Sequence, residues 1–188
     1  MARTIFEHIG GNVVCPGKVL CDRRDGGHLV VNPSRPVWER SVLSTGELIA
    51  WSVLVAATGQ AMLDVLPALR GGCLNYWEAG NWALNDLAEP EGPKQPRVHR
   101  RVHLHIFGRS RTAQHVDWRW GESPRFPDFA DADRWSAQFA PLGVAECDAI
   151  AVRLAALLAT RYRIPACDPH HRQRTASAPG IAGAACAN

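Results

Sequence analysis

The chain has 188 residues, of which 21% are charged, and a formal net charge of +3. This length suits one domain with a sizeable core, and the charge is too small to indicate a nucleic acid partner. No apolar run approaches the roughly 18 residues of a membrane span, and the start of the chain lacks the apolar stretch of a signal peptide, so we expect no membrane partner.

The cysteines are scattered along the chain and form no C-x-x-C pair. This pattern favours reduced thiols in a cytoplasmic protein, although their even number leaves disulfides open. They are Cys15, Cys21, Cys73, Cys147, Cys167 and Cys186.

Turn residues divide the first part of the chain into short candidate strands. Pro16-Gly17 is a turn signal, and a β-branched run is closed by Pro33. We expect three strands, at residues 12–14, 19–21 and 28–32. The stretch 22–27 is interpreted as a hairpin loop between the last two.

Two helices are predicted from apolar residues at helical spacing. The first covers residues 45–66, because Ser44 is a typical N-cap, Glu47 is its reciprocal partner three residues later, and Pro67 ends the run. The second covers residues 144–162, with an apolar stripe along one side.

The remaining segments are a strand candidate at 73–77, a long loop at 81–97 and an irregular segment at 110–133. A loop as long as 81–97 beside a candidate site more often contributes to function than serves only as a connection. The end of the chain is small and polar without periodicity. We therefore expect one domain over 1–165 and a disordered tail over 166–188.

The stretch 101–109, RVHLHIFGR, alternates between the two faces of a strand. One face is apolar, and the other carries the side chains of Arg101, His103 and His105. Two histidines at i and i+2 lie roughly 6–7 Å apart, close enough to hold one small anionic group together. An edge strand with a solvated histidine face is the plainer alternative.

Two separated parts of the chain resemble the histidine triad hydrolases and nucleotidyl transferases. The first runs from GHLVVNPSRPV at 27–37 to LSTGEL at 43–48. It is similar to the family's N-terminal block, where a strand beginning Gly-His leads through a Pro-x-Arg turn to a capped helix. The fragile histidine triad branch of dinucleoside polyphosphate hydrolases shows this block in its most similar form.

The second part runs from LNY at 74–76 and Gly80-Asn81 to HLHI at 103–106 and Arg109. It is similar to the strand ending in Gly-Asn of bacterial members, followed by their histidine strand and a basic residue. Together the two parts span roughly residues 12 to 110 in the family's order.

The chain departs from the family in two places. The family motif is His-apolar-His-apolar-His, and Arg101 stands where the first His belongs. His99 lies on the same face one step earlier, either as a compensation or by coincidence. The loop at 82–98 is also longer than its counterparts. Both departures bear on rate and substrate more than on fold.

The resemblance implies an α+β fold: a single domain with an antiparallel sheet of about five strands and two main helices, often paired as a homodimer. It implies a nucleotide substrate that is cleaved at the α-phosphate through a covalent nucleotidyl intermediate on the middle histidine, His103. Water, phosphate or another acceptor then resolves the intermediate. No cofactor and no metal is expected.

The residues themselves suit this chemistry. An imidazole is nucleophilic near neutral pH, which fits His103. A phosphoryl-transfer transition state is stabilised mainly by positioned hydrogen-bond donors and positive charge. We expect His105 to donate to a phosphate oxygen or to the leaving group, and Arg101 and Arg109 to neutralise charge.

Four further residues complete the candidate site. Asn75 or Asn81 is expected to hold a phosphate oxygen or to orient His103, although hydrogen bonding at a strand end is an equal alternative. By family analogy Asp22 accepts from the ribose hydroxyls, or else it is a plain turn residue. His99 is a substrate-binding candidate through its place on the same face.

Other residues are expected to have structural or stacking roles and no direct part in the reaction. His28 is expected to be structural. One tryptophan is expected to stack on a base, but the sequence does not choose among Trp77, Trp82, Trp118 and Trp120.

Two alternatives to the enzyme remain open. Because Arg101 replaces a triad member, the chain could be a catalytically weakened nucleotide-binding or regulatory protein. A zinc site built from His99, His103 and His105 is less favoured, since three histidines on one strand rarely surround a tetrahedral ion without other ligands.

Overall fold

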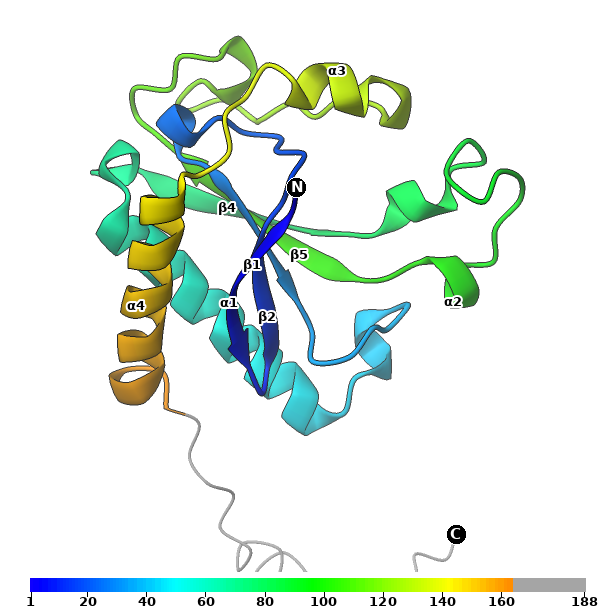
Figure 1. The fold of residues 1–188 in the computed structure, drawn as a ribbon, viewed down its shortest axis with the longest axis horizontal. Coiled ribbons are helices and arrows are strands. Elements are labelled where there is room, and N and C mark those ends of the chain that lie inside the picture. Colours follow the sequence, from blue (N-terminus) through cyan, green and yellow to red (C-terminus); the bar gives the residue numbers. More distant parts are fainter. Residues whose placement is uncertain (164–188) are drawn as a thin grey trace, which may run out of the picture.

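The centre of the computed structural model, which describes residues 1–163, is an antiparallel sheet with strand order β1-β2-β3-β5-β4 (Figure 1). The predicted α+β class, with one antiparallel five-stranded sheet, is confirmed. The strands are β1 Arg3–His8, β2 Gly11–Cys15, β3 His28–Asn32, β4 Cys73–Ala79 and β5 His103–Arg109.

Two long helices, α1 (Thr45–Val65) and α4 (Val144–Thr160), cover one face of the sheet (Figure 1). Ser44 and Glu47 form the predicted capping box at the start of α1. The apolar face of β5 meets these helices, and Ile106 is fully buried in the resulting core. Two short helices lie between these elements. Helix α2 (Pro96–His99) precedes β5, and helix α3 (Ala132–Ser136) lies between β5 and α4.

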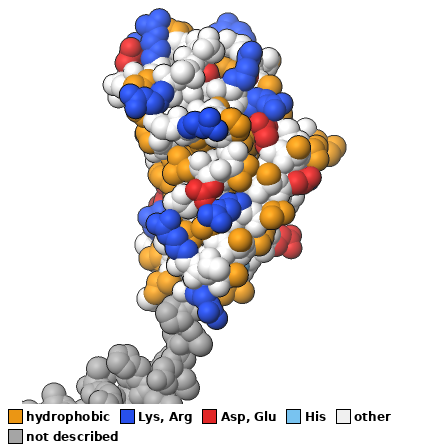
Figure 2. Space-filling view, turned by 90° about the vertical axis from the view of Figure 1, so that its left-hand side faces the viewer, with side chains coloured by type: hydrophobic (Ala, Val, Ile, Leu, Met, Phe, Trp, Pro, Cys, Tyr) orange, Lys and Arg blue, Asp and Glu red, His pale blue; other side chains and the backbone are white. Residues whose placement is uncertain are grey.

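By length and composition, α1 is the one helix in the described part of the chain that could cross a membrane. Its apolar side chains serve the core instead, because Trp51, Leu54 and Met62 are almost fully buried. The face seen in Figure 2 carries basic side chains interspersed with apolar ones, without one continuous basic patch.

The other face of the sheet is covered by segments without long helices. Phe107 of β5 packs there in a second apolar cluster with Trp118 and Phe139, which come from the chain between β5 and α4. The irregular segment 110–133 is thus fixed to the body by its aromatic residues. In Figure 1 these connections lie at the top of the sheet.

The predicted strand at 19–21 is wrong. These residues are buried in the second cluster, but side chains rather than a neighbouring strand satisfy their backbone. The N–H of Leu20 donates to His28 Nδ1, and its carbonyl accepts from the indoles of Trp118 and Trp135. An apolar run whose backbone is satisfied in this way cannot be distinguished from a strand by its pattern.

Strand β1 was not expected from the sequence. Its pairing with β2 shifts register between Thr4 and Phe6, so Ile5 lies in a β-bulge. Both Ile5 and Phe6 pack against the core. The bulge therefore breaks the alternation by which a half-buried strand is recognised.

The other boundaries differ by small amounts. β4 runs to Ala79, α4 ends at Thr160, and β5 begins at His103 instead of at residue 101. The N–H of Val102 donates to Val37 instead of joining the sheet. The predicted loop at 81–97 includes a 3-10 turn at Asn81–Leu84 and the start of α2. The expected tail, 166–188, lies outside the described residues.

Candidate functional site

The candidate site occupies the polar face of β5, at the end where the strand begins. His103 and His105 point away from the helices, while Leu104 and Ile106, which alternate with them along the strand, are buried in the main core. On the neighbouring strand β4, Ala79 pairs with His103 and Trp77 with His105. The pairing places Trp77 beside the two histidines on one face of the sheet.

Three histidines form a continuous hydrogen-bonded chain. His103 Nε2 lies 2.9 Å from His105 Nε2, and His105 Nδ1 lies 2.7 Å from His28 Nε2. The chain ends at two backbone groups: the N–H of Leu20 donates to His28 Nδ1 over 3.3 Å, and the carbonyl of Arg101 lies 2.9 Å from His103 Nδ1.

These two ends fix the tautomers of the neutral rings. A carbonyl only accepts, so His103 carries its proton on Nδ1 and keeps a lone pair on Nε2. His105 Nε2–H then donates to that lone pair, and His28 Nε2–H donates to His105 Nδ1. The remaining acceptor, His28 Nδ1, is the atom that the amide of Leu20 requires. Both ends therefore agree on one assignment.

Burial keeps these imidazoles neutral. It lowers the pKa of His105 to about 3, with a further contribution from His103. Burial also lowers the pKa of His103 below its usual value, helped by the nearby charge of Arg100 and opposed by the carbonyl of Arg101. The pKa of His28 lies well below 6.5, chiefly because the ring is fully buried. At neutral pH His103 Nε2 thus carries a lone pair, which accepts from His105 Nε2–H.

A pocket of about 260 Å³ opens onto His103 and His105. Its walls include the indole rings of Trp77 and Trp82 and the side chain of Leu20. Trp77 stacks on the His105 ring with centroids 5.5 Å apart. Apolar walls around a few polar groups are typical of sites for small organic molecules.

The pocket has an unbalanced positive charge. Arg101 lines it, and among residues 1–163 its guanidinium donates only to the carbonyl of Arg100. Glu78 also lines it, but this carboxylate is paired with Arg40 at 2.6 Å. The net positive charge of the pocket lining therefore favours the binding of an anion.

The backbone of Arg101 passes close to Gly80. Gly80 has a φ of 138°, and a Cβ at this position would lie 2.7 Å from the carbonyl oxygen of Arg101. That carbonyl is the acceptor for His103 Nδ1. Glycine at position 80 thus lets the backbone approach the site closely enough to set the orientation of His103.

Asn81 lines the same pocket, and its amide is oriented by Arg100. Arg100 Nε donates to Asn81 Oδ1 over 3.0 Å, which leaves the amide NH₂ of Asn81 to act as donor. Arg100 Nη1 also holds Glu39 at 2.9 Å and the carbonyl of Trp38. Arg100 could not be selected from the sequence, since a basic residue beside a histidine strand carries no distinctive signal.

The structure brings five of the predicted site residues together: Arg101, His103, His105, Asn81 and His99 all line this pocket. His99 does so from α2, where its Nδ1 lies 3.2 Å from the carbonyl of Gln95. His28 joins the site through His105, although it was expected to be only structural.

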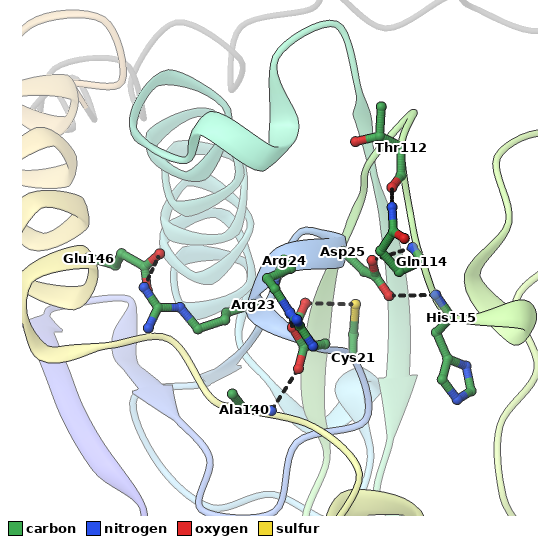
Figure 3. Close-up of polar contacts among 10 residues, drawn as sticks. Cys21, Arg23, Arg24, Asp25, Thr112, Gln114, His115, Ala140 and Glu146 are labelled. Carbon is green, nitrogen blue, oxygen red and sulfur yellow. Dashed lines mark hydrogen bonds and ion pairs between the residues drawn. The ribbon is translucent and has the colours of Figure 1, made fainter.

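Asp22 lies elsewhere, in a turn packed against the chain before α4. Its carboxylate accepts from the main-chain N–H of Ala140 and of Arg24, both at 2.8 Å, and its pKa is lowered by these bonds despite burial. Figure 3 shows this turn, where Asp25 likewise accepts from the amides of Gln114 and His115. The Asp22 carboxylate thus links this turn to the segment before α4, and the Asp25 carboxylate links it to the segment after β5.

Asn75 and Arg109 also lie away from the histidine pocket. They line a second pocket near the end of β5, together with Trp120. Arg109 is buried, and its Nη2 donates to the carbonyls of Arg119 and Glu122. Of the four tryptophans considered, Trp77 and Trp82 are the two at the histidine pocket, while Trp118 is buried in the second cluster.

No group of three or more His, Cys, Asp or Glu side chains within residues 1–163 is arranged to hold a metal ion. The three-histidine zinc alternative has no support in this geometry. His99 bonds its own helix turn, and His103 and His105 bond each other.

No protein-family model and no curated protein matches this sequence.

Proposed function

We propose that this protein is a histidine triad hydrolase or nucleotidyl transferase that attacks the α-phosphate of a nucleotide or dinucleoside polyphosphate through His103 Nε2. The observation that supports it most strongly is the tautomer assignment. The carbonyl of Arg101 holds the proton on His103 Nδ1, so Nε2 carries the lone pair, which accepts from His105 Nε2–H in the free protein.

In the first step, His103 Nε2 forms a bond to phosphorus, and the bond from phosphorus to the leaving group breaks. His105 Nε2–H, which donates to His103 in the free protein, is then released to donate to a phosphate oxygen. The resulting nucleotidyl-imidazole is cationic, and the carbonyl of Arg101 stabilises it through the Nδ1 proton. The leaving group takes its proton from the solvent or from a bound donor.

In the second step, water or another acceptor attacks phosphorus, the N–P bond breaks, and the acceptor loses a proton. His103 returns to its neutral state. The positive charge of Arg101 attracts the phosphate chain, and the NH₂ group of Asn81 is placed to donate to it. The indoles of Trp77 and Trp82 supply apolar walls for the base.

Assembly as a cytoplasmic homodimer belongs to the same proposal. The described cysteines are all free. Strand β4 is an edge of the sheet and exposes about half of Tyr76 (49%). An edge strand with exposed aromatic side chains is suited to pairing with a second copy.

The test is turnover of a panel of dinucleoside polyphosphates, nucleoside phosphoramidates and nucleotide sugars by wild type and His103→Ala. Wild type is expected to turn over at least one class of substrate, and His103→Ala is expected to lose this turnover while keeping nucleotide binding within a few-fold. Nucleotide binding by wild type without turnover of any member of the panel would favour the weakened binding protein instead.

A further inference from the structure

A second pocket, of about 390 Å³, lies at the opposite end of the same sheet face. It is lined by Arg109 and Asn75 from the sheet and by Trp120, Glu122 and Ser123 from the following segment. Arg109 is six residues beyond His103 on β5, which corresponds to about 20 Å along the strand. The two pockets are therefore separate sites.

The charge of Arg109 lacks a counter-ion within residues 1–163. The side chain is only 4% exposed, and it forms no ion pair there. Nη2 donates to the carbonyls of Arg119 and Glu122, each at 2.7 Å, and the Trp118 ring lies 5.5 Å from the guanidinium. Nη1 is buried and has no hydrogen-bond acceptor among the described residues.

A buried guanidinium with a free donor is costly unless something compensates for it. Two carbonyls and one aromatic ring compensate partly, but none of them carries a full negative charge. The planar guanidinium matches the oxygens of a phosphoryl group, which accept two parallel hydrogen bonds. An oxyanion in the pocket would compensate the charge of Arg109.

We propose that this second pocket binds the phosphoryl group of a small molecule, with Arg109 as its anchor. Asn75 and Ser123 offer neutral hydrogen-bond donors on the pocket wall. Glu122 also lines the pocket, and Arg111, whose guanidinium lies 5.2 Å from the Trp120 ring, supplies a positive charge against that carboxylate. The exposed Trp120 ring gives the rest of the ligand an apolar surface. The site is independent of the nucleotide chemistry proposed for the histidine pocket.

The probe is inorganic phosphate, measured by calorimetric titration and by thermal unfolding of the full chain against chloride at equal ionic strength. Arg101→Ala serves as the background that weakens binding to the histidine pocket, because it removes the positive charge that lines that pocket. Phosphate is expected to raise the Tm of wild type and of Arg101→Ala, and to bind the second pocket of both with a similar Kd.

Asn75→Asp tests the position of the anion. Asn75 is exposed on the edge strand, so the substitution preserves the fold, and the added carboxylate repels phosphate whether or not it reaches Arg109. We expect phosphate affinity to fall about tenfold or more. Asn12→Asp is the matched control: it adds the same charge on β2 and keeps the oxygen that accepts from Asn32. It should leave the Kd unchanged.

Arg109→Gln should abolish the phosphate effect in a folded protein. The Asn75→Asp result decides the matter if Arg109→Gln does not fold. The proposal is overturned if phosphate leaves the Tm of wild type unchanged, if its effect disappears in Arg101→Ala, or if Asn75→Asp binds phosphate like wild type.

Discussion

His28 Nε2 lies 2.7 Å from His105 Nδ1, so a histidine at the start of β3 determines which nitrogen of a β5 histidine carries the proton. This bond connects the buried interior to the candidate nucleophile, because His105 in turn contacts His103. We expect His28→Phe to keep the ring packing while removing the donor. Without that donor His105 can adopt the other tautomer, and kcat should fall roughly ten- to a hundredfold, with KM changed less. Steady-state kinetics test this, and an unchanged kcat would contradict the assignment.

The neutral histidines also predict how stability depends on pH. His28, His103 and His105 have pKa values below the usual 6.5 in the folded state. The unfolded chain therefore binds more protons as pH falls below about 6.5, and the stability present above that pH is lost. For His105, whose folded pKa is about 3, the loss continues over the whole acid range.

Chemical denaturation between pH 7 and pH 5 measures this effect. Each such histidine contributes a slope of up to about 1.4 kcal/mol per pH unit below its unfolded pKa. Carboxylates stay ionised in both states over most of this window, so they contribute little. His105→Asn should flatten the slope, and a free energy of unfolding independent of pH in wild type would rule out buried neutral imidazoles.

Gly80→Ala should damage the site through the backbone. The new Cβ would lie 2.7 Å from the carbonyl of Arg101, and the φ of 138° is unfavourable for alanine. We expect a loss of about 1–3 kcal/mol in stability together with reduced turnover. Gly92→Ala is the control, since Gly92 also has a positive φ, 104°, but has open space around its Cβ position. Equal effects of the two variants on turnover would contradict the role of this contact.

Arg100→Gln should weaken substrate binding through Asn81. The substitution removes the Nε donor to Asn81 Oδ1 and the ion pair with Glu39. The freed amide no longer presents its NH₂ group to the pocket, so KM should rise about tenfold with a smaller change in kcat. Arg97→Gln, which removes a nearby exposed arginine stacked on Trp38, is the control. A KM equal to that of wild type would remove Arg100 as a positioning residue.

The two variants of Arg101 separate an enzyme from a weakened relative. Arg101→Ala keeps the backbone carbonyl that orients His103 but removes the unpaired charge at the pocket. Substrate Kd should rise roughly ten- to a hundredfold, and turnover should fall. Arg101→His should also be slower than wild type. A faster histidine variant would mean that the arginine marks lost catalysis.

The sequence could predict the parts of this protein in which local pattern and structure agree. Alternation placed the histidines on one face of β5, and the Ser44–Glu47 pair marked the start of α1. The pattern failed where distant side chains decide the outcome. The backbone of Leu20 is satisfied by His28, Trp118 and Trp135, so its segment is no strand.

The candidate site shows the same division. Residues on the histidine strand could be selected by spacing, but Asp22 and Arg109 are placed by long-range contacts that no spacing reveals. The same holds for His28, which meets His105 only because β3 pairs with β5. The sequence predicts a role for the Arg101 side chain, whereas in the structure the main-chain carbonyl of Arg101 contacts His103.

The most direct test of the central claim is to trap the covalent intermediate. Wild type is mixed with a substrate that it turns over, quenched within one turnover at alkaline pH, and analysed by intact-mass and peptide mass spectrometry. The account predicts a nucleoside monophosphate adduct on the peptide that contains His103, absent from His103→Ala. Turnover that persists in His103→Ala, with no adduct on wild type, would contradict it.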